Sequence, residues 1–157
     1  MSMDIHSFFE AIRSNNSTAV ENAIKATPTL VSSKDDRGST PLILATYYGN
    51  LEVAKVLLNH NAAIDAKDGA GNTALMGVCF KGYLAIAEYL IEKGASVNTV
   101  NASGATPLIY ASTFNKEAIV KLLLAKNADK HIKDHRGNTA LDNAKLQGFD
   151  SLLPLLS

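Results

Sequence analysis

The chain lacks several features that mark particular classes of protein. It contains one cysteine, Cys79, so no intrachain disulfide can form, and it contains no tryptophan. No apolar run approaches the roughly 18 residues that a membrane-spanning helix requires, so we expect no membrane association. The first residues show no basic stretch followed by an apolar one, and we therefore expect no secretory signal.

Neither sign of charge is in excess. Fifteen Lys and Arg residues balance fifteen Asp and Glu residues, so the formal net charge is zero. Nucleic acids and anionic membranes select proteins with a basic excess, and we expect neither as a partner. An apolar fraction of 46% and a charged fraction of 19% are typical of a folded protein rather than a disordered one. Together with the missing targeting signals, this composition predicts a cytoplasmic protein.

The chain does contain a repeat with a period of 33 residues. A glycine and, two residues later, a threonine recur four times at this interval: Gly38 and Thr40, Gly71 and Thr73, Gly104 and Thr106, and Gly137 and Thr139. A period maintained over four copies indicates that one supersecondary unit has been copied along the chain.

The local chemistry of one copy predicts a turn and two helices. Gly38 suits a turn that needs a positive φ, Thr40 is a good N-cap, and Pro41 suits the first helical position. A second helix is expected from about Leu51. Asn61 falls where a residue in the left-handed conformation closes that helix.

Apolar residues recur at the same interval and form three columns: Leu42, Leu75, Leu108 and Leu141; Val53, Ile86, Ile119 and Leu152; and Leu57, Leu90, Leu123 and Leu156. Two short helices cannot bury such a stripe alone, so neighbouring units must stack and share a core. The same spacing places Phe9, Ile12, Val20 and Ile24 in a first unit that lacks the glycine and threonine and serves as an N-terminal cap. Pro154 predicts a short closing helix at the other end.

The copies resemble the ankyrin repeat, a 33-residue unit built around Thr-Pro-Leu-His-x-Ala. The similarity lies in segments such as Gly-Ser-Thr-Pro-Leu-Ile-Leu-Ala from Gly38 and Gly-Ala-Thr-Pro-Leu-Ile-Tyr-Ala from Gly104. The family's histidine is replaced, and with it the helix-bracing hydrogen bond that it usually makes, at Ile43, Met76, Ile109 and Asp142.

This resemblance implies an all-α fold, an ankyrin-repeat solenoid of stacked helix-turn-helix units joined by β-turn or hairpin-like loops. It covers residues 35–150 by motif and residues 4–34 by the apolar columns alone. We expect a single domain over residues 1–157. Its units are expected at about 4–35 (the N-terminal cap), 36–68, 69–101, 102–134 and 135–157 (the C-terminal cap).

The resemblance also implies a function, because ankyrin-like stacks bind other proteins through their turn tips and first helices, which line a concave groove. It implies no catalysis and no cofactor, and the sequence contains no serine-hydrolase, zinc-protease, phosphate-loop or dinucleotide motif. We expect a non-catalytic adaptor or inhibitor that docks a protein partner and is itself a monomer. The alternative is a self-associating scaffold, a homodimer formed through the apolar groove.

Carried onto this sequence, the variable positions of the family give the candidate partner-binding residues: Arg37, Ser39, Tyr47, Tyr48, Asn72, Phe80, Lys81, Thr113, Phe114 and Arg136. Four of these are aromatic and fall at only two offsets of the repeat. Large aromatic side chains at half-exposed positions suit a protein interface. The alternative is packing, in which each ring lies across the next unit beside small residues such as Gly77 and Ala111.

Two further features suggest chemistry but fit the repeat better. His131 and His135 have the spacing of a helical metal-binding pair, yet they fall in an extended stretch and a turn, so we expect no metal site. Cys79 falls at a helix position that we expect to be partly covered. No basic residue directly adjoins it to lower its pKa, so we expect no reactive thiol.

Overall fold

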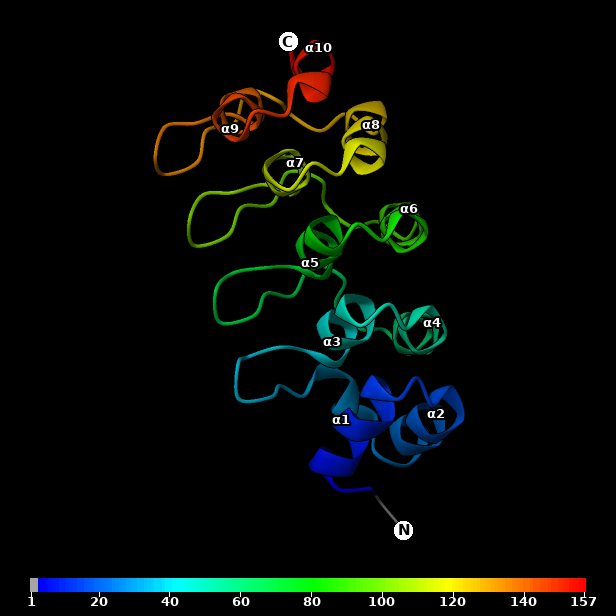
Figure 1. Ribbon diagram of the computed structural model, residues 1–157. Helices are drawn as coiled ribbons and strands as arrows, with labels where there is room; N and C mark the ends of the chain where they lie inside the picture. The colour runs from blue at the N-terminus through cyan, green and yellow to red at the C-terminus, as the bar shows by residue number, and fades with distance from the viewer. Residues whose placement is uncertain (1–2) are drawn as a thin grey trace.

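The computed structural model describes residues 3–157, and its helices stack in chain order along one axis (Figure 1). Ten α-helices are present in this part of the chain: α1 (Ile5–Arg13), α2 (Ser17–Ala26), α3 (Pro41–Tyr47), α4 (Leu51–Asn59), α5 (Ala74–Lys81), α6 (Leu84–Glu92), α7 (Pro107–Thr113), α8 (Glu117–Ala125), α9 (Ala140–Gln147) and α10 (Leu153–Leu156). Two 3₁₀ helices, η1 (Pro28–Ser32) and η2 (Asp150–Leu152), complete the described structure, which contains no β-strand. The all-α solenoid expected from the repeat is confirmed.

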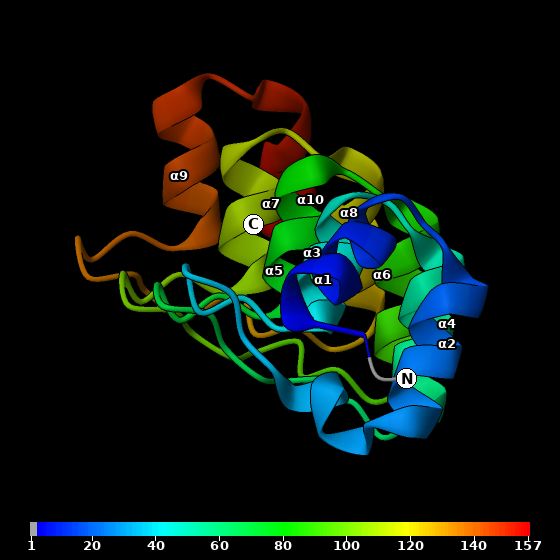
Figure 2. The same cartoon turned by 90° about the horizontal axis from the view of Figure 1, so that it is seen from below.

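The helices form two layers. The inner helices are α1, α3, α5, α7 and α9, and the outer helices are α2, α4, α6 and α8, with α10 closing the stack (Figure 1). The loops that precede α3, α5, α7 and α9 project from the inner layer, on the side away from the outer helices. Viewed along the stack, these loops fan out on one side of the molecule (Figure 2). Turns and inner helices therefore share one face.

Threonine caps start the inner helices after the first. The Oγ1 atoms of four threonines accept hydrogen bonds of 3.1–3.3 Å from the backbone N–H three residues later, and the residues are Thr40, Thr73, Thr106 and Thr139. Such a cap stabilises a helix by about 1 kcal/mol. Asn61 and Gly94 follow outer helices with φ of 68° and 101°, so the expected left-handed closure is confirmed.

Each turn is held by one side-chain oxygen. The Asp35 Oδ1 accepts hydrogen bonds of 2.9 Å from the backbone N–H groups of Arg37 and Ser39. The same two bonds form at Asp68, Asn101 and Asp134. Neighbouring turns are also joined, since a backbone N–H of each later turn donates to the carbonyl of the turn before: Gly69 to Arg37, Ala102 to Ala70, and His135 to Ser103.

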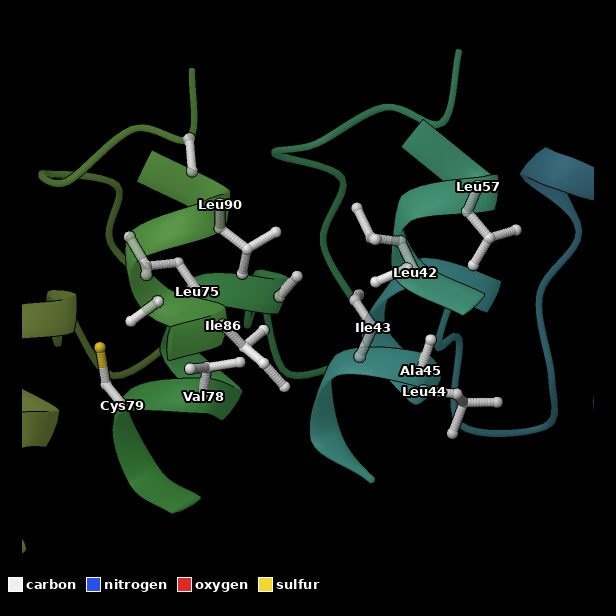
Figure 3. Close-up of a cluster of buried hydrophobic side chains, with 14 of the residues drawn as sticks. Leu42, Ile43, Leu44, Ala45, Leu57, Leu75, Val78, Cys79, Ile86 and Leu90 are labelled. Atoms are coloured by element: carbon white, nitrogen blue, oxygen red, sulfur yellow. The ribbon is translucent and has the colours of Figure 1, made fainter. Parts of the chain in front are cut away.

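The apolar columns belong to one continuous core. Figure 3 shows part of it, in which Leu42, Leu57, Leu75, Ile86 and Leu90 are labelled. Every member of the three columns is buried except Leu141, which is half-buried. Cys79 was expected to be partly covered, but the stacked units bury it completely and leave none of its surface exposed. Burial raises the pKa of its thiol, since an apolar environment disfavours the thiolate.

The C-terminal end closes with a short helix, as Pro154 predicts. The proline lies in the first turn of α10, directly after η2, where its missing N–H breaks no helical hydrogen bond. None of the helices in residues 3–157 combines the length and apolar character needed to cross a bilayer.

Candidate protein-binding groove

Three adjoining hollows run along the face formed by the turns and the inner helices, and together we call them the groove. The first hollow, of about 490 Å³, lies at α3 and its turn, and the third hollow, of about 570 Å³, lies at α7 and the turn before α9. Between them, a central hollow of about 260 Å³ is lined by Tyr47, Asn72, Met76, Gly77, Phe80, Tyr110 and Phe114. Nine of the ten candidate residues line at least one hollow, and only Lys81 lines none.

Five aromatic rings cross three units as one row along the groove. In order, this aromatic row consists of Tyr48, Tyr47, Phe80, Phe114 and Tyr110. Successive ring centroids are 5.9, 6.5, 4.7 and 6.1 Å apart, alternating between edge-to-face and stacked contacts. Offset and edge-to-face pairs of this kind stabilise by roughly 0.5–1.5 kcal/mol beyond burial. The rings therefore do pack on one another, as the packing alternative requires.

The same rings keep much of their surface open. Tyr47, Phe80 and Phe114 are 37–40% exposed, and Tyr48 is 49% exposed. Exposed apolar side chains that gather in one place mark a binding surface more often than scattered ones do. Mutual packing thus accounts for the inner part of each ring and leaves the outer part facing the groove.

Sequence reasoning did not select Tyr110, the fifth member of the row. Its hydroxyl donates a 3.2 Å hydrogen bond to Asn72 Oδ1, and Asn101 Nδ2 donates to the same oxygen at 2.9 Å and to the Tyr110 hydroxyl at 3.1 Å. The signal was in the sequence, because Asn101 occupies the position of Asp35 and Asp68. Its amide can donate where a carboxylate cannot.

The candidate polar residues differ in how much of their surface is exposed. Ser39 lines the first hollow but is only 7% exposed, so it offers little surface to a partner. Thr113 is half-buried, and its hydroxyl donates 2.7 Å to the Ile109 carbonyl. Arg37, Lys81 and Arg136 are exposed.

Charged groups are distributed unevenly between the two layers. Within residues 3–157, four of the five ion pairs involve the outer-layer acids Glu21, Glu52 and Glu117, whereas Arg37, Lys81 and Arg136 form none.

The Lys81 ammonium lies 4.9 Å from the Tyr47 ring centroid and 5.9 Å from that of Tyr83, in cation–π contact with both.

The carboxylates near the groove are engaged by their own turns. Partial burial opposes ionisation of Asp134, but hydrogen bonds from Asn138, Asn143 and Arg136 outweigh it and lower the pKa of this carboxyl. The pKa of Asp142 is also lowered, because the backbone N–H of Thr139 donates to it in a capping box. Both shifts follow from holding a turn or a helix end and give no sign of acid–base chemistry.

Metal-ligating side chains do not converge in the described part of the chain, where no group of three His, Cys, Asp or Glu residues is placed to hold an ion. The backbone N–H of His135 donates 3.0 Å to the Ser103 carbonyl, and its ring lies against Gly104. His135 is thus part of a contact between turns. What the groove offers is an apolar row with a few exposed cations, an arrangement suited to binding.

Comparison with known families agrees with this architecture. A family model described as ankyrin repeats (3 copies) matches residues 8–101, and another described as ankyrin repeats (many copies) matches residues 90–144. A search of curated proteins returned no match.

Proposed function

The chain belongs to the ankyrin repeat family, and on that premise we propose that it is a single five-unit domain that docks a protein partner in its groove. Ankyrin repeats are generally protein–protein interaction modules and are typically non-catalytic. The proposed role is that of an adaptor or inhibitor, which acts by binding a partner and does not change it chemically.

The aromatic row is the observation that carries this proposal. Interface hot spots are enriched in aromatic side chains and cluster near the centre of a contact, and the row lies in the middle three units. Tyr47, Phe80 and Phe114 contribute one ring each from α3, α5 and the end of α7. A partner covering these units would bury on the order of 800 Å² of this chain, the usual size of a specific interface.

Affinity capture from a lysate of the source organism tests the proposal. The groove variant combines Tyr47→Ala, Phe80→Ala and Phe114→Ala. The matched control combines Leu84→Ala, Tyr89→Ala and Val100→Ala, which remove three apolar side chains outside the three hollows. Circular dichroism first establishes that both variants keep wild-type helicity.

A protein that wild type and control capture, and that the groove variant loses, supports docking in the groove. A partner retained by all three chains contradicts it, because the binding face then lies elsewhere. Size-exclusion chromatography with light scattering is run on the same samples. A wild-type dimer that only the groove variant dissociates would show that the partner is a second copy, as the scaffold alternative holds.

We also propose that the protein acts in the cytoplasm. Cys79 is a buried free thiol and is the only cysteine, and proteins of oxidising compartments more often rely on disulfides. Fractionation of cells that express the tagged chain, followed by immunoblotting, checks this location.

A further inference from the structure

The central hollow exists because a glycine interrupts one side of α5. Gly77 occupies the repeat position that holds Leu44, Tyr110 and Asn143 in the second, fourth and fifth units and Ala11 in the first. A glycine within a helix costs about 1 kcal/mol relative to alanine, and Gly77 does not have a positive φ that would require it. A Cβ at Gly77 would lie 3.4 Å from Tyr47 Cδ1, an ordinary contact, so packing does not require glycine either. The absent side chain leaves space between the rings.

The size and lining of this space indicate what it can hold. Its volume of about 260 Å³ is smaller than the roughly 300–1,000 Å³ of small-molecule sites, which favours one protruding side chain. Met76, 1% exposed, and Gly77 belong to α5, and the rings of Tyr47, Phe80 and Phe114 surround them. The polar groups of Asn72 and Tyr110 also line the hollow, but they are hydrogen-bonded to each other and to Asn101. Such a surface matches an apolar side chain better than a polar one, which would lose hydration.

A cation lies beside the hollow. Lys81 contacts the ring of Tyr47, which lines both the first hollow and the central one. Cation–π contacts with Tyr47 and Tyr83 hold its ammonium near the rim, and within residues 3–157 it forms no ion pair. Its charge is therefore available to a partner.

The carboxylates that line the groove lie in its two end hollows: Asp35, Asp36 and Asp68 line the first hollow, and Asp134 lines the third. Asp68 Oδ1 accepts the N–H groups of Ala70 and Asn72, and Asp134 Oδ1 accepts those of Arg136 and Asn138. No carboxylate lines the central hollow. The charged group in contact with one of its rings is the ammonium of Lys81, and a carboxylate is the complement of that group.

Building on the proposed protein-binding function, we propose that the central hollow receives one apolar side chain of an acidic partner segment. A carboxylate of the same segment pairs with Lys81. For an extended segment, the two groups are separated by about two residues, or on the order of 7 Å of chain. The apolar side chain supplies most of the affinity, and the ion pair supplies orientation and selectivity.

A library of short random peptides displayed on phage provides the test. The library is selected on wild type, and enriched peptides are synthesised and measured by fluorescence anisotropy. We expect a consensus with one large apolar residue and an Asp or Glu about two positions away. Gly77→Leu, which fills the hollow, should weaken binding at least about tenfold, the usual effect of removing a hot-spot contact. It should leave the melting temperature equal or higher, because leucine is the better helix former.

Matched control variants distinguish the effect of filling the hollow or removing the Lys81 charge from the general effect of such a substitution elsewhere. Ala118→Leu adds the same side chain to an exposed position of α8 and should leave affinity unchanged. Lys81→Gln should weaken binding about threefold, and the effect should vanish for a peptide whose acidic residue is replaced by its amide. Lys55→Gln on α4, another lysine over a tyrosine ring, should have no effect.

Three outcomes would overturn the inference. Selected peptides that bind Gly77→Leu as tightly as wild type show that the hollow is not used. If the triple groove variant still abolishes their binding, docking in the groove survives and only the hollow fails. A consensus without an acidic residue, or insensitivity to Lys81→Gln, overturns the ion pair. If no peptide is enriched, a single anchored segment is not sufficient, while the capture experiment still decides the proposed function.

Discussion

The turns of the fourth and fifth units have the same design but different neighbours. Gly104 and Gly137 both adopt positive φ, 76° and 83°, two residues before a threonine cap. A Cβ on Gly104 would lie 2.6 Å from His135 Cδ2 and 3.0 Å from the His135 nitrogen. A Cβ on Gly137 would meet nothing within 4 Å among the described residues. The same motif supports contact between units only where another unit follows.

The inner helices of these two units differ in the same way. α7 buries five residues, Pro107, Leu108, Ile109, Ala111 and Ser112, whereas α9 buries only Ala140 and Ala144. Leu146, the second-last residue of α9, is 71% exposed. In a solenoid, stability is approximately a sum of unit and interface terms. The last unit has one interface instead of two, so equal substitutions should cost it less.

The largest expected difference lies in the core column that contains Leu90 and Leu156. Leu90→Ala should destabilise by on the order of 3–4 kcal/mol, because the cavity lies between packed units. Leu156→Ala should cost roughly half as much or less, because α10 has four residues and frays more easily. Urea denaturation followed by circular dichroism measures both. Equal losses would show that the C-terminal unit is as strongly coupled as the central ones.

The turn glycines sharpen the comparison at a single position of the repeat. Gly104→Val should destabilise by about 3 kcal/mol, because strain at positive φ adds to a collision with the next turn. Gly137→Val should cost only the strain, about 1–2 kcal/mol. Thermal unfolding of the two variants compares them directly. A larger loss at Gly137 would mean that contact between turns contributes little.

Lowering the pH should destabilise the turn of the fifth unit, because the Asp134 carboxylate that holds this turn becomes protonated. The pKa of this carboxyl is lowered in the folded state, so its stabilisation is present above the ordinary Asp value, near about 4, and is lost as pH falls through the lowered pKa. Asp134→Asn keeps an oxygen for the turn, as Asn101 does, but cannot titrate. We expect the variant to be less stable at neutral pH by less than about 1 kcal/mol, because the site is partly exposed.

Urea titrations at a series of pH values test this expectation. The stability gap between wild type and Asp134→Asn should narrow as the pH is lowered. A gap that stays constant or widens in acid would show that ionised Asp134 does not support the turn.

The smallest effect is expected at Thr113. Thr113→Ala removes a hydroxyl that donates only to a carbonyl within its own helix, and the side chain is half-buried. The loss of stability should stay below about 0.5 kcal/mol. Differential scanning calorimetry can resolve it, and a loss comparable to that of Gly104→Val would mean that Thr113 has an unseen role between units.

Much of the fold could be predicted because the repeat encodes it locally. Threonine caps, a proline at the first helical position and Asn61 each act within a few residues of chain, so their roles did not depend on the neighbouring unit. Pro154 likewise set the short closing helix. Residues whose environment depends on stacking were harder to predict: Ser39 and Cys79 are more buried than their positions suggested, and Leu141 is less buried.

In the candidate groove, too, some features could be predicted from the sequence, whereas others depended on the stacking of the units. The variable positions could be identified by their offset in the repeat, and their side chains were known to be aromatic. The contacts that join the units into one row could not, because the rings of Tyr47, Phe80 and Phe114 touch one another across units, about 33 residues apart in sequence. Tyr110 was missed for a related reason, since its hydroxyl donates to Asn72, which lies 38 residues earlier in the sequence.

The sequence by itself determined the period, the helices, their caps and the turns, because these depend on backbone preferences and hydrogen bonds between near neighbours. Only the tertiary structure decided which side chains the stack covers and which it leaves open. It placed Gly77 among the rings that line the central hollow and Lys81 against the ring of Tyr47, and it left α9 with only two buried residues. Burial and proximity between units are properties of the stack, in which each unit's environment is supplied by the next.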